Sequence, residues 1–115
     1  MKNTFLLFAF LFCYALNAQG TYPIRNFSPS DYKARNQNWA IAQAPTGDMY
    51  FANNEGLLKY NGLNWTLYPS PNRSELRSVF LVDQRIYTGC YREFGYWSED
   101  QEGGLQYTSL SDSFQ

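Results

Sequence analysis

Residues 49–68, MYFANNEGLLKYNGLNWTLY, consist of short apolar segments separated by turn residues. Asn61 and Gly62 give the strongest hairpin signal, because both residue types tolerate the positive φ that a tight turn requires. These segments show no 3.6-residue apolar period, so helices are not indicated. Together with residues 39–44 and the proline-glycine turn that follows them, the stretch predicts an antiparallel meander of four strands over residues 39–68.

The pattern restarts after a proline-rich connector at residues 69–75. Tyr87 falls 37 positions after Tyr50, in a segment of similar composition. The strands predicted for this second unit are residues 76–82, 85–90, 94–99 and 105–110. A period near forty residues with four strands per unit is typical of β-propeller blades. The sequence therefore predicts an all-β fold of consecutive four-stranded antiparallel propeller blades, at residues 39–68 and 76–110.

Aromatic residues make up 19% of the chain, and many of them fall on the predicted strands. A blade with two apolar faces needs a neighbour on each face, and a closed propeller contains about four to eight blades. Two blades would leave two faces uncovered. We therefore expect an incomplete propeller, the N-terminal part of a longer protein, in which residues 111–115 begin a truncated next unit. A free-standing barrel or sandwich of eight strands is the alternative.

The first 18 residues have the composition of a secretory signal peptide rather than of a folded unit. Lys2 supplies a positive charge, residues 5–16 form an apolar run, and Ala18 is the small residue that precedes a cleavage site. The run is shorter than the roughly 20 residues of a membrane span, which disfavours the alternative of a retained anchor helix. The sequence predicts a signal-peptide helix at residues 1–18, cleaved between Ala18 and Gln19, and a lead-in segment at residues 19–38.

Composition excludes several classes of site within these residues. The chain has no histidine, so it cannot assemble histidine-dependent nucleophilic catalysis or histidine-ligated zinc. After cleavage Cys90 is the only cysteine, and we expect it to be a small buried apolar residue. A net charge of −1 with scattered basic residues does not favour nucleic-acid binding by this segment. We expect no catalytic residues, no metal and no cofactor.

Three stretches carry a resemblance to a known family. IAQAPTGDMYFANNEGLLKYNG (41–62) resembles the two-component-regulator propeller repeat. FSPSDYKARNQNWAI (27–41) and RIYTGCYREFGYW (85–97) resemble exported regulators of Bacteroidetes-type Gram-negative bacteria. In that family a seven-bladed propeller region precedes a triple-tyrosine domain, one transmembrane helix, a coiled coil and a LuxR-type helix-turn-helix. The resemblance extends from about Tyr22 to Leu110, and the downstream domains are implied by the family alone.

The resemblance implies a periplasmic sensor that forms part of an inner-membrane protein. The ligand would be a small molecule or an oligosaccharide, DNA would be bound only through a downstream domain, and the full-length protein would form a homodimer. A related group ends in a hybrid histidine kinase instead, so that output is one alternative. An extracellular polysaccharide-active enzyme and a scaffold propeller are the others.

The predicted ligand-binding residues are Arg92, Glu93 and Trp97. Ligands of propellers commonly lie at the mouth of the central channel, among the loops, and residues 91–94 look longer than their counterpart at residues 53–55. Arg92 and Glu93 would bond hydroxyl groups while Trp97 stacks on a sugar ring. The structural alternative is that Trp97 packs between blades and that Arg92 and Glu93 lie in an ordinary turn.

The signal-peptide prediction can be tested on the exported protein. We expect the mature chain to begin at Gln19, because Ala18 is the small residue that signal peptidase requires before its cleavage site. Intact-mass measurement of the chain from the periplasmic fraction would show this. An exported product that retains residues 1–18 would contradict the prediction.

Overall fold

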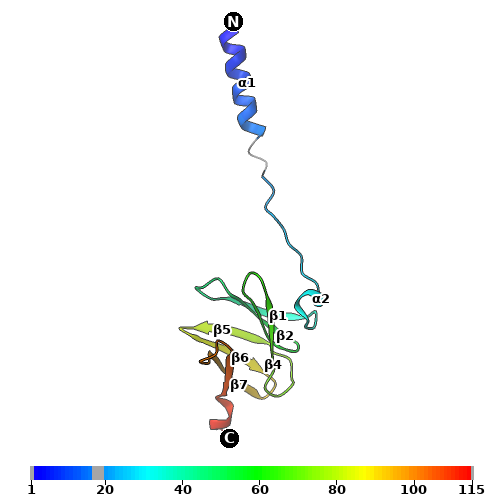
Figure 1. The fold of residues 1–115 in the computed structure, drawn as a ribbon, viewed down its shortest axis with the longest axis vertical. Coiled ribbons are helices and arrows are strands. Elements are labelled where there is room, and N and C mark those ends of the chain that lie inside the picture. Colours follow the sequence, from blue (N-terminus) through cyan, green and yellow to red (C-terminus); the bar gives the residue numbers. More distant parts are fainter. Residues whose placement is uncertain (1, 17–19, 115) are drawn as a thin grey trace.

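The computed structural model describes residues 2–16 and 20–114 (Figure 1). Helix α1 (Lys2–Leu16) stands apart from the rest of the molecule, and its side chains up to Cys13 are exposed. Within the described ranges, no helix has both the length and the apolar character needed to cross a membrane. The predicted cleavage site lies outside the described residues, so the signal peptide stays a prediction.

The first sheet contains β1 (Asn38–Gln43), β2 (Met49–Asn53), β3 (Gly56–Tyr60) and β4 (Trp65–Pro69) in that order, all antiparallel. The β3–β4 turn has four residues rather than the two of a tight primed turn. It is stabilised by the Asn61 side chain, whose Oδ1 accepts hydrogen bonds from two backbone amides of the same turn. The predicted meander is therefore confirmed.

The second sheet contains β5 (Ser78–Val82), β6 (Arg85–Cys90), β7 (Glu93–Glu99) and β8 (Leu105–Ser109), again in sequence order and antiparallel. A short 3₁₀ helix, η1 (Ser111–Phe114), follows β8. The all-β prediction is confirmed, because the described chain beyond α1 and the one-turn α2 (Pro29–Tyr32) consists mainly of these two sheets. No strand of one sheet pairs with a strand of the other in the described part, so the sheets do not close into a barrel.

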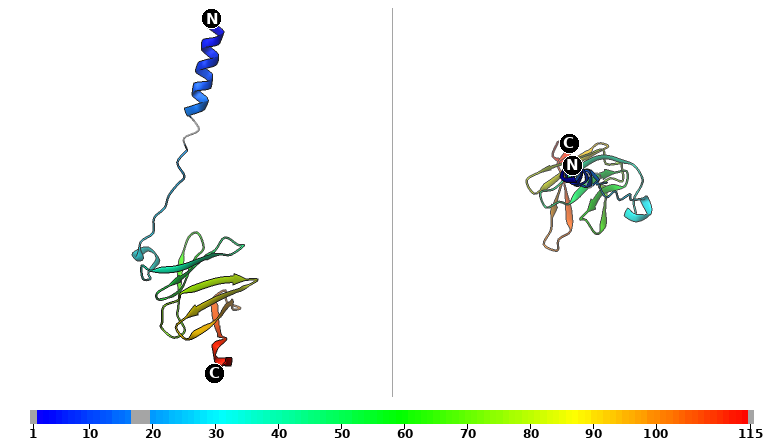
Figure 2. Two further views of the ribbon diagram at one scale, coloured as in Figure 1. Left: turned by 180° about the vertical axis from the view of Figure 1, so that it is seen from behind. Right: turned by 90° about the horizontal axis from the view of Figure 1, so that it is seen from above.

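The two sheets stack face to face, the first above the second in Figure 1 and again in the left view of Figure 2. The core between them is formed by Tyr50, Ala52, Leu57, Leu76, Val79, Ile86 and Trp97. Strand β1 adds only the small side chains of Ala40 and Ala42 at its contact with β5, whereas β4 and β8 add Tyr68 and Tyr107. Small residues near β1 and large ones near β4 give the core a taper.

The faces that meet are not equivalent in the two repeats. Tyr50 and Leu57 of the first sheet belong to the core between the sheets. Their counterparts 37 positions later, Tyr87 and Phe94, alternate with the core residues Ile86 and Trp97 and so lie on the face of the second sheet turned away from the first. The sheets therefore stack head to tail. We call the face of each sheet that carries Tyr50 or its counterpart Tyr87 the forward face, and the opposite face the rear face.

The lead-in covers the β4 side of the rear face of the first sheet, whereas Ile41 of β1 on the same face is 60% exposed. Phe27 and Tyr32 pack on the Trp65 ring, with centroids 5.1 and 5.4 Å away, and Trp65 also stacks on Tyr60 at 4.4 Å. Ser28 and Asp31 form a capping box that fixes α2, the helix carrying Tyr32. We call Phe27, Tyr32, Tyr60 and Trp65 the aromatic plug. The forward face of the second sheet has no such cover in the described chain, and Phe80 there is 67% exposed.

The inter-sheet core makes a stability prediction. Leu57 is fully buried, so Leu57→Ala should lower the free energy of unfolding by about 2–5 kcal/mol through lost apolar burial and the cavity left behind. Leu63→Ala is the matched control, because Leu63 is 85% exposed and the same truncation there should change stability by less than about 0.5 kcal/mol. Urea unfolding of both variants measures the difference. Equal effects would show that the two sheets do not share this core.

Candidate functional site

Four connections gather at one end of the stacked sheets, which we call the connector end. They are the lead-in before β1, the β2–β3 turn, the β6–β7 turn, and the connector between β4 and β5, which spans residues 70–77. They share an end because alternate connections in an antiparallel sheet lie on the same side. The connector has to cross from the outermost strand β4 back to β5 beside β1, so it runs over this end of the core.

Asn53 holds the connector end together. Its side chain is fully buried, and its Nδ2 donates to the Arg35 carbonyl at 2.7 Å and to Asn38 Oδ1 at 2.9 Å. Its Oδ1 accepts from the Glu55 amide at 3.0 Å, and its carbonyl accepts from the Leu76 amide at 3.2 Å. One residue thus links the lead-in, β1, the β2–β3 turn and the connector.

In the second sheet this role moves to Asn72 of the connector, because Cys90 stands at the position that corresponds to Asn53. Asn72 Nδ2 donates to the Tyr91 carbonyl at 2.8 Å, and its Oδ1 accepts from Ser74 Oγ at 2.6 Å. Ser74 Oγ in turn accepts from the Tyr91 amide at 3.2 Å. Cys90 is half-buried against the core, with its Sγ 3.4 Å from Asn72 Oδ1. The connector and the β6–β7 turn are therefore fixed to one another.

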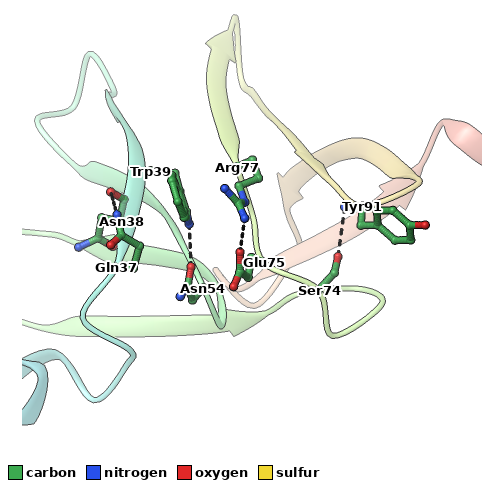
Figure 3. A network of polar contacts seen from close by, with 8 residues as sticks. All are labelled: Gln37, Asn38, Trp39, Asn54, Ser74, Glu75, Arg77 and Tyr91. Carbon is green, nitrogen blue, oxygen red and sulfur yellow. Dashed lines mark hydrogen bonds and ion pairs between the residues drawn. The ribbon is translucent and has the colours of Figure 1, made fainter.

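A line of polar and aromatic side chains runs across the connector end (Figure 3). Trp39 Nε1 donates to Asn54 Oδ1 at 2.7 Å, and the Arg77 guanidinium carbon lies 3.8 Å from the Trp39 ring centroid. Arg77 also forms an ion pair with Glu75, at 2.6 Å. Trp39 lies within β1 and Arg77 immediately precedes β5, 38 positions later. The residues that follow them, Ala40 and Ser78, pair with equivalent positions of β2 and β6. Adjacent repeats thus contribute the two halves of one cation–π pair.

An open hollow of about 520 Å³ lies beside this line of side chains, and we call it the connector hollow. Its charged lining residues are Arg35, Glu55, Arg73 and Glu75. Its remaining walls are Asn54, Ser70, Leu67 and Pro69. The volume falls within the range of about 300–1,000 Å³ that is usual for small-molecule sites.

Arg92 and Glu93 lie at the connector end, but the prediction that they belong to a longer loop than residues 53–55 was wrong. The β6–β7 turn contains two residues, Tyr91 and Arg92, as the β2–β3 turn contains Asn54 and Glu55. The extra residues of the second repeat lie in β7 and in the β7–β8 turn instead. Arg92 is exposed and adopts a left-handed φ of 55°, as the tight turn requires.

Glu93 is occupied by contacts within the second sheet. Its Oε1 accepts from the Tyr107 hydroxyl at 2.7 Å, and its Oε2 accepts from Ser111 Oγ at 2.6 Å. Burial tends to raise the pKa of Glu93, but hydrogen bonds from Ser109, Ser111 and Tyr107 outweigh it, so the pKa lies below its usual value. Burial of Tyr107 itself, together with the hydrogen-bonded Glu93 carboxylate, raises the pKa of Tyr107 well above its usual value. This carboxylate therefore stabilises the end of β8.

Trp97 is buried in the core and not at the connector end. Its ring lies 5.9 Å from the Tyr68 ring and 5.0 Å from the Tyr107 ring, and its Nε1 donates to Thr88 Oγ1 at 2.9 Å. Only 4% of Trp97 is exposed, so it offers no open stacking face in this structure. The structure does not bring Trp97 together with Arg92 and Glu93 in one site.

Sequence reasoning missed the side chains that do gather at the connector end: Trp39, Asn54, Arg73, Glu75 and Arg77. The spacing of 38 positions between Trp39 and Arg77 was a usable signal, because it is within one residue of the 37-position repeat. In the described residues, no group of three or more cysteine, aspartate or glutamate residues is placed to hold a metal ion. Comparison of this chain with family models, curated proteins and solved structures found no match.

The Glu93 contacts predict a pH dependence of stability. The folded-state pKa is lowered, so the contribution of Glu93 is present above the unfolded value of about 4.3 and is lost as the pH falls through the folded value. Glu93→Gln should therefore be less stable than the natural protein near pH 7, and the difference should shrink towards about pH 3.

Thermal unfolding across this pH range would measure the effect. Glu102→Gln serves as the control, since Glu102 is exposed in the β7–β8 turn. A gap between Glu93→Gln and the natural protein that stays constant across the pH range would contradict the assignment.

Proposed function

We propose that the two sheets are consecutive blades of a β-propeller, and that the chain is the periplasmic sensor part of a membrane-spanning transcriptional regulator. The observation that carries the propeller is the head-to-tail stacking. A contact between non-equivalent faces can be repeated by each added sheet, and a constant rotation between sheets closes such a series into a ring. A two-fold sandwich would instead bring equivalent faces together.

The tapered core supports the same architecture. Sheets arranged around a central axis must lie close at their innermost strands and spread outward. Ala40 and Ala42 of β1 allow the close approach of β5, while Tyr68, Trp97 and Tyr107 fill the wider space between the outer strands. Interior positions of closed β folds commonly use small and large residues in this way to fit a taper.

The connector end supports recognition rather than catalysis. Loops held by a rigid scaffold are the usual place for binding residues, and here Asn53 and Asn72 fix the loops beneath an exposed surface of Trp39, Arg77 and Glu75. Sugars are commonly bound by aromatic rings beside side chains that donate and accept hydrogen bonds. This surface has both, and the chain has no histidine to act as a base at neutral pH.

In this proposal, binding at the connector end changes how the propeller is arranged with respect to downstream domains. A transmembrane helix would carry the change to a cytoplasmic LuxR-type DNA-binding domain. The resemblance of residues 27–62 and 85–97 to such regulators is the support for this output. The DNA would be bound by the downstream domain, and the protein would act as a homodimer.

The reading frame beyond codon 115 gives a direct test. We expect further repeats, then one apolar stretch of about 20 residues, and then a helix-turn-helix. Kinase motifs in place of the helix-turn-helix would assign the sensor to the hybrid histidine kinases. A frame that stops within about 200 codons would contradict the proposal, because too few blades would be encoded to close a ring.

A cellular test addresses signalling itself. Deleting the gene should abolish the response of its target promoters to their inducer, and the full-length gene should restore it. Full-length protein lacking residues 1–18 should fail to restore the response, because its sensor would stay in the cytoplasm. Restoration by that variant would contradict a periplasmic sensor.

A further inference from the structure

We infer that the connector hollow binds a saccharide that bears a carboxylate, and that Arg73 is the residue that binds the carboxylate. The inference rests on the proposed sensor function and specifies the ligand class. It also replaces the residues expected from sequence, since Trp97 is buried and Glu93 is already bonded within its own sheet.

Among the charged residues that line the connector hollow, Arg73 is the one without an ion-pair partner in the described residues. Arg35 pairs with Glu55 at 3.6 Å, and Glu75 pairs with Arg77 at 2.6 Å. In the described part of the chain, no carboxylate lies within ion-pair distance of the Arg73 guanidinium. A guanidinium matches the planar geometry of a carboxylate and can bind it through two parallel hydrogen bonds.

The backbone at Arg73 is held in place before any ligand arrives, and its side chain is exposed. Its φ is 64°, in the left-handed region that non-glycine residues rarely occupy, and its amide donates to the Ser70 carbonyl at 3.3 Å. The neighbouring Asn72 anchors this part of the connector to Tyr91 and Ser74. A fixed connector lowers the entropy that binding must overcome.

The rest of the lining offers polar and apolar groups that suit a sugar ring. Asn54 Oδ1 accepts a hydrogen bond from Trp39, so the Asn54 Nδ2 group stays available as a donor to a ligand hydroxyl. The Glu55 carboxylate can accept a hydrogen bond from another hydroxyl. Leu67 and Pro69 provide an apolar wall for the C–H face of a pyranose.

Calorimetry tests the inference by measuring the affinity of the full chain for short oligouronates from pectin and alginate. The methyl esters of the same oligomers serve as uncharged controls. The free acids should bind at least about tenfold more tightly than the esters, as expected for one charge-assisted contact. Their affinity should fall between about 0.01 M and 0.15 M salt, because an exposed ion pair is screened.

Two variants locate the effect. Arg73→Gln should weaken binding of the acids at least about tenfold and leave the weak binding of the esters unchanged. Arg85→Gln removes the same charge from a β6 residue that lies over Tyr96, so it should bind the acids like the natural protein. Thermal unfolding of both variants would verify that they remain folded.

The inference is overturned if acids and esters bind equally, if Arg73→Gln binds the acids normally, or if neither class of oligouronate binds at all. Full competition by acetate at the concentration of the oligomers would also overturn it, since the hollow would then recognise only an isolated carboxylate. None of these results decides the proposed sensor function, which the reading frame and the promoter response test independently.

Discussion

Packing of the forward face of the first sheet against the rear face of the second is the constraint on which this structure depends. Leu57 is fully buried there, and the small side chains of Ala40 and Ala42 allow β5 to lie beside β1. Because β5 lies beside β1, the chain must cross from β4 over the edge of the core. That crossing brings the connector to Asn53 and builds the surface that we interpret as a recognition site.

The strands could be predicted because local chemistry specifies them. Alternating apolar residues and turn residues were enough to locate the four strands of the second unit to within about two residues. The relative lengths of the turns could not be predicted. The residues 91–94 look like a loop, yet Glu93 and Phe94 belong to β7, since Glu93 is bonded to Tyr107 and Ser111 far along the chain. Such tertiary contacts override local propensity.

The candidate site was less predictable than the fold for a related reason. Trp97 has the side chain expected of a sugar platform, and only its place in the alternation of β7 puts it in the core. The contact between Trp39 and Arg77 depends on how two repeats stack, which neither repeat encodes alone. Arg73 differs from Arg35 and Arg77 because each of those two residues forms an ion pair with a glutamate, and only the three-dimensional structure shows this difference.

The aromatic plug makes the two ends of the stack chemically different. Any series of units joined head to tail is able to recruit a second molecule at either end and so grow into a fibre. Here Phe27 and Tyr32 occupy the rear of the first sheet, so an incoming molecule would have to displace them from Trp65. The rear of the first sheet is therefore already partly filled, and in the proposed ring the last blade would pack against the plug as well as against the sheet.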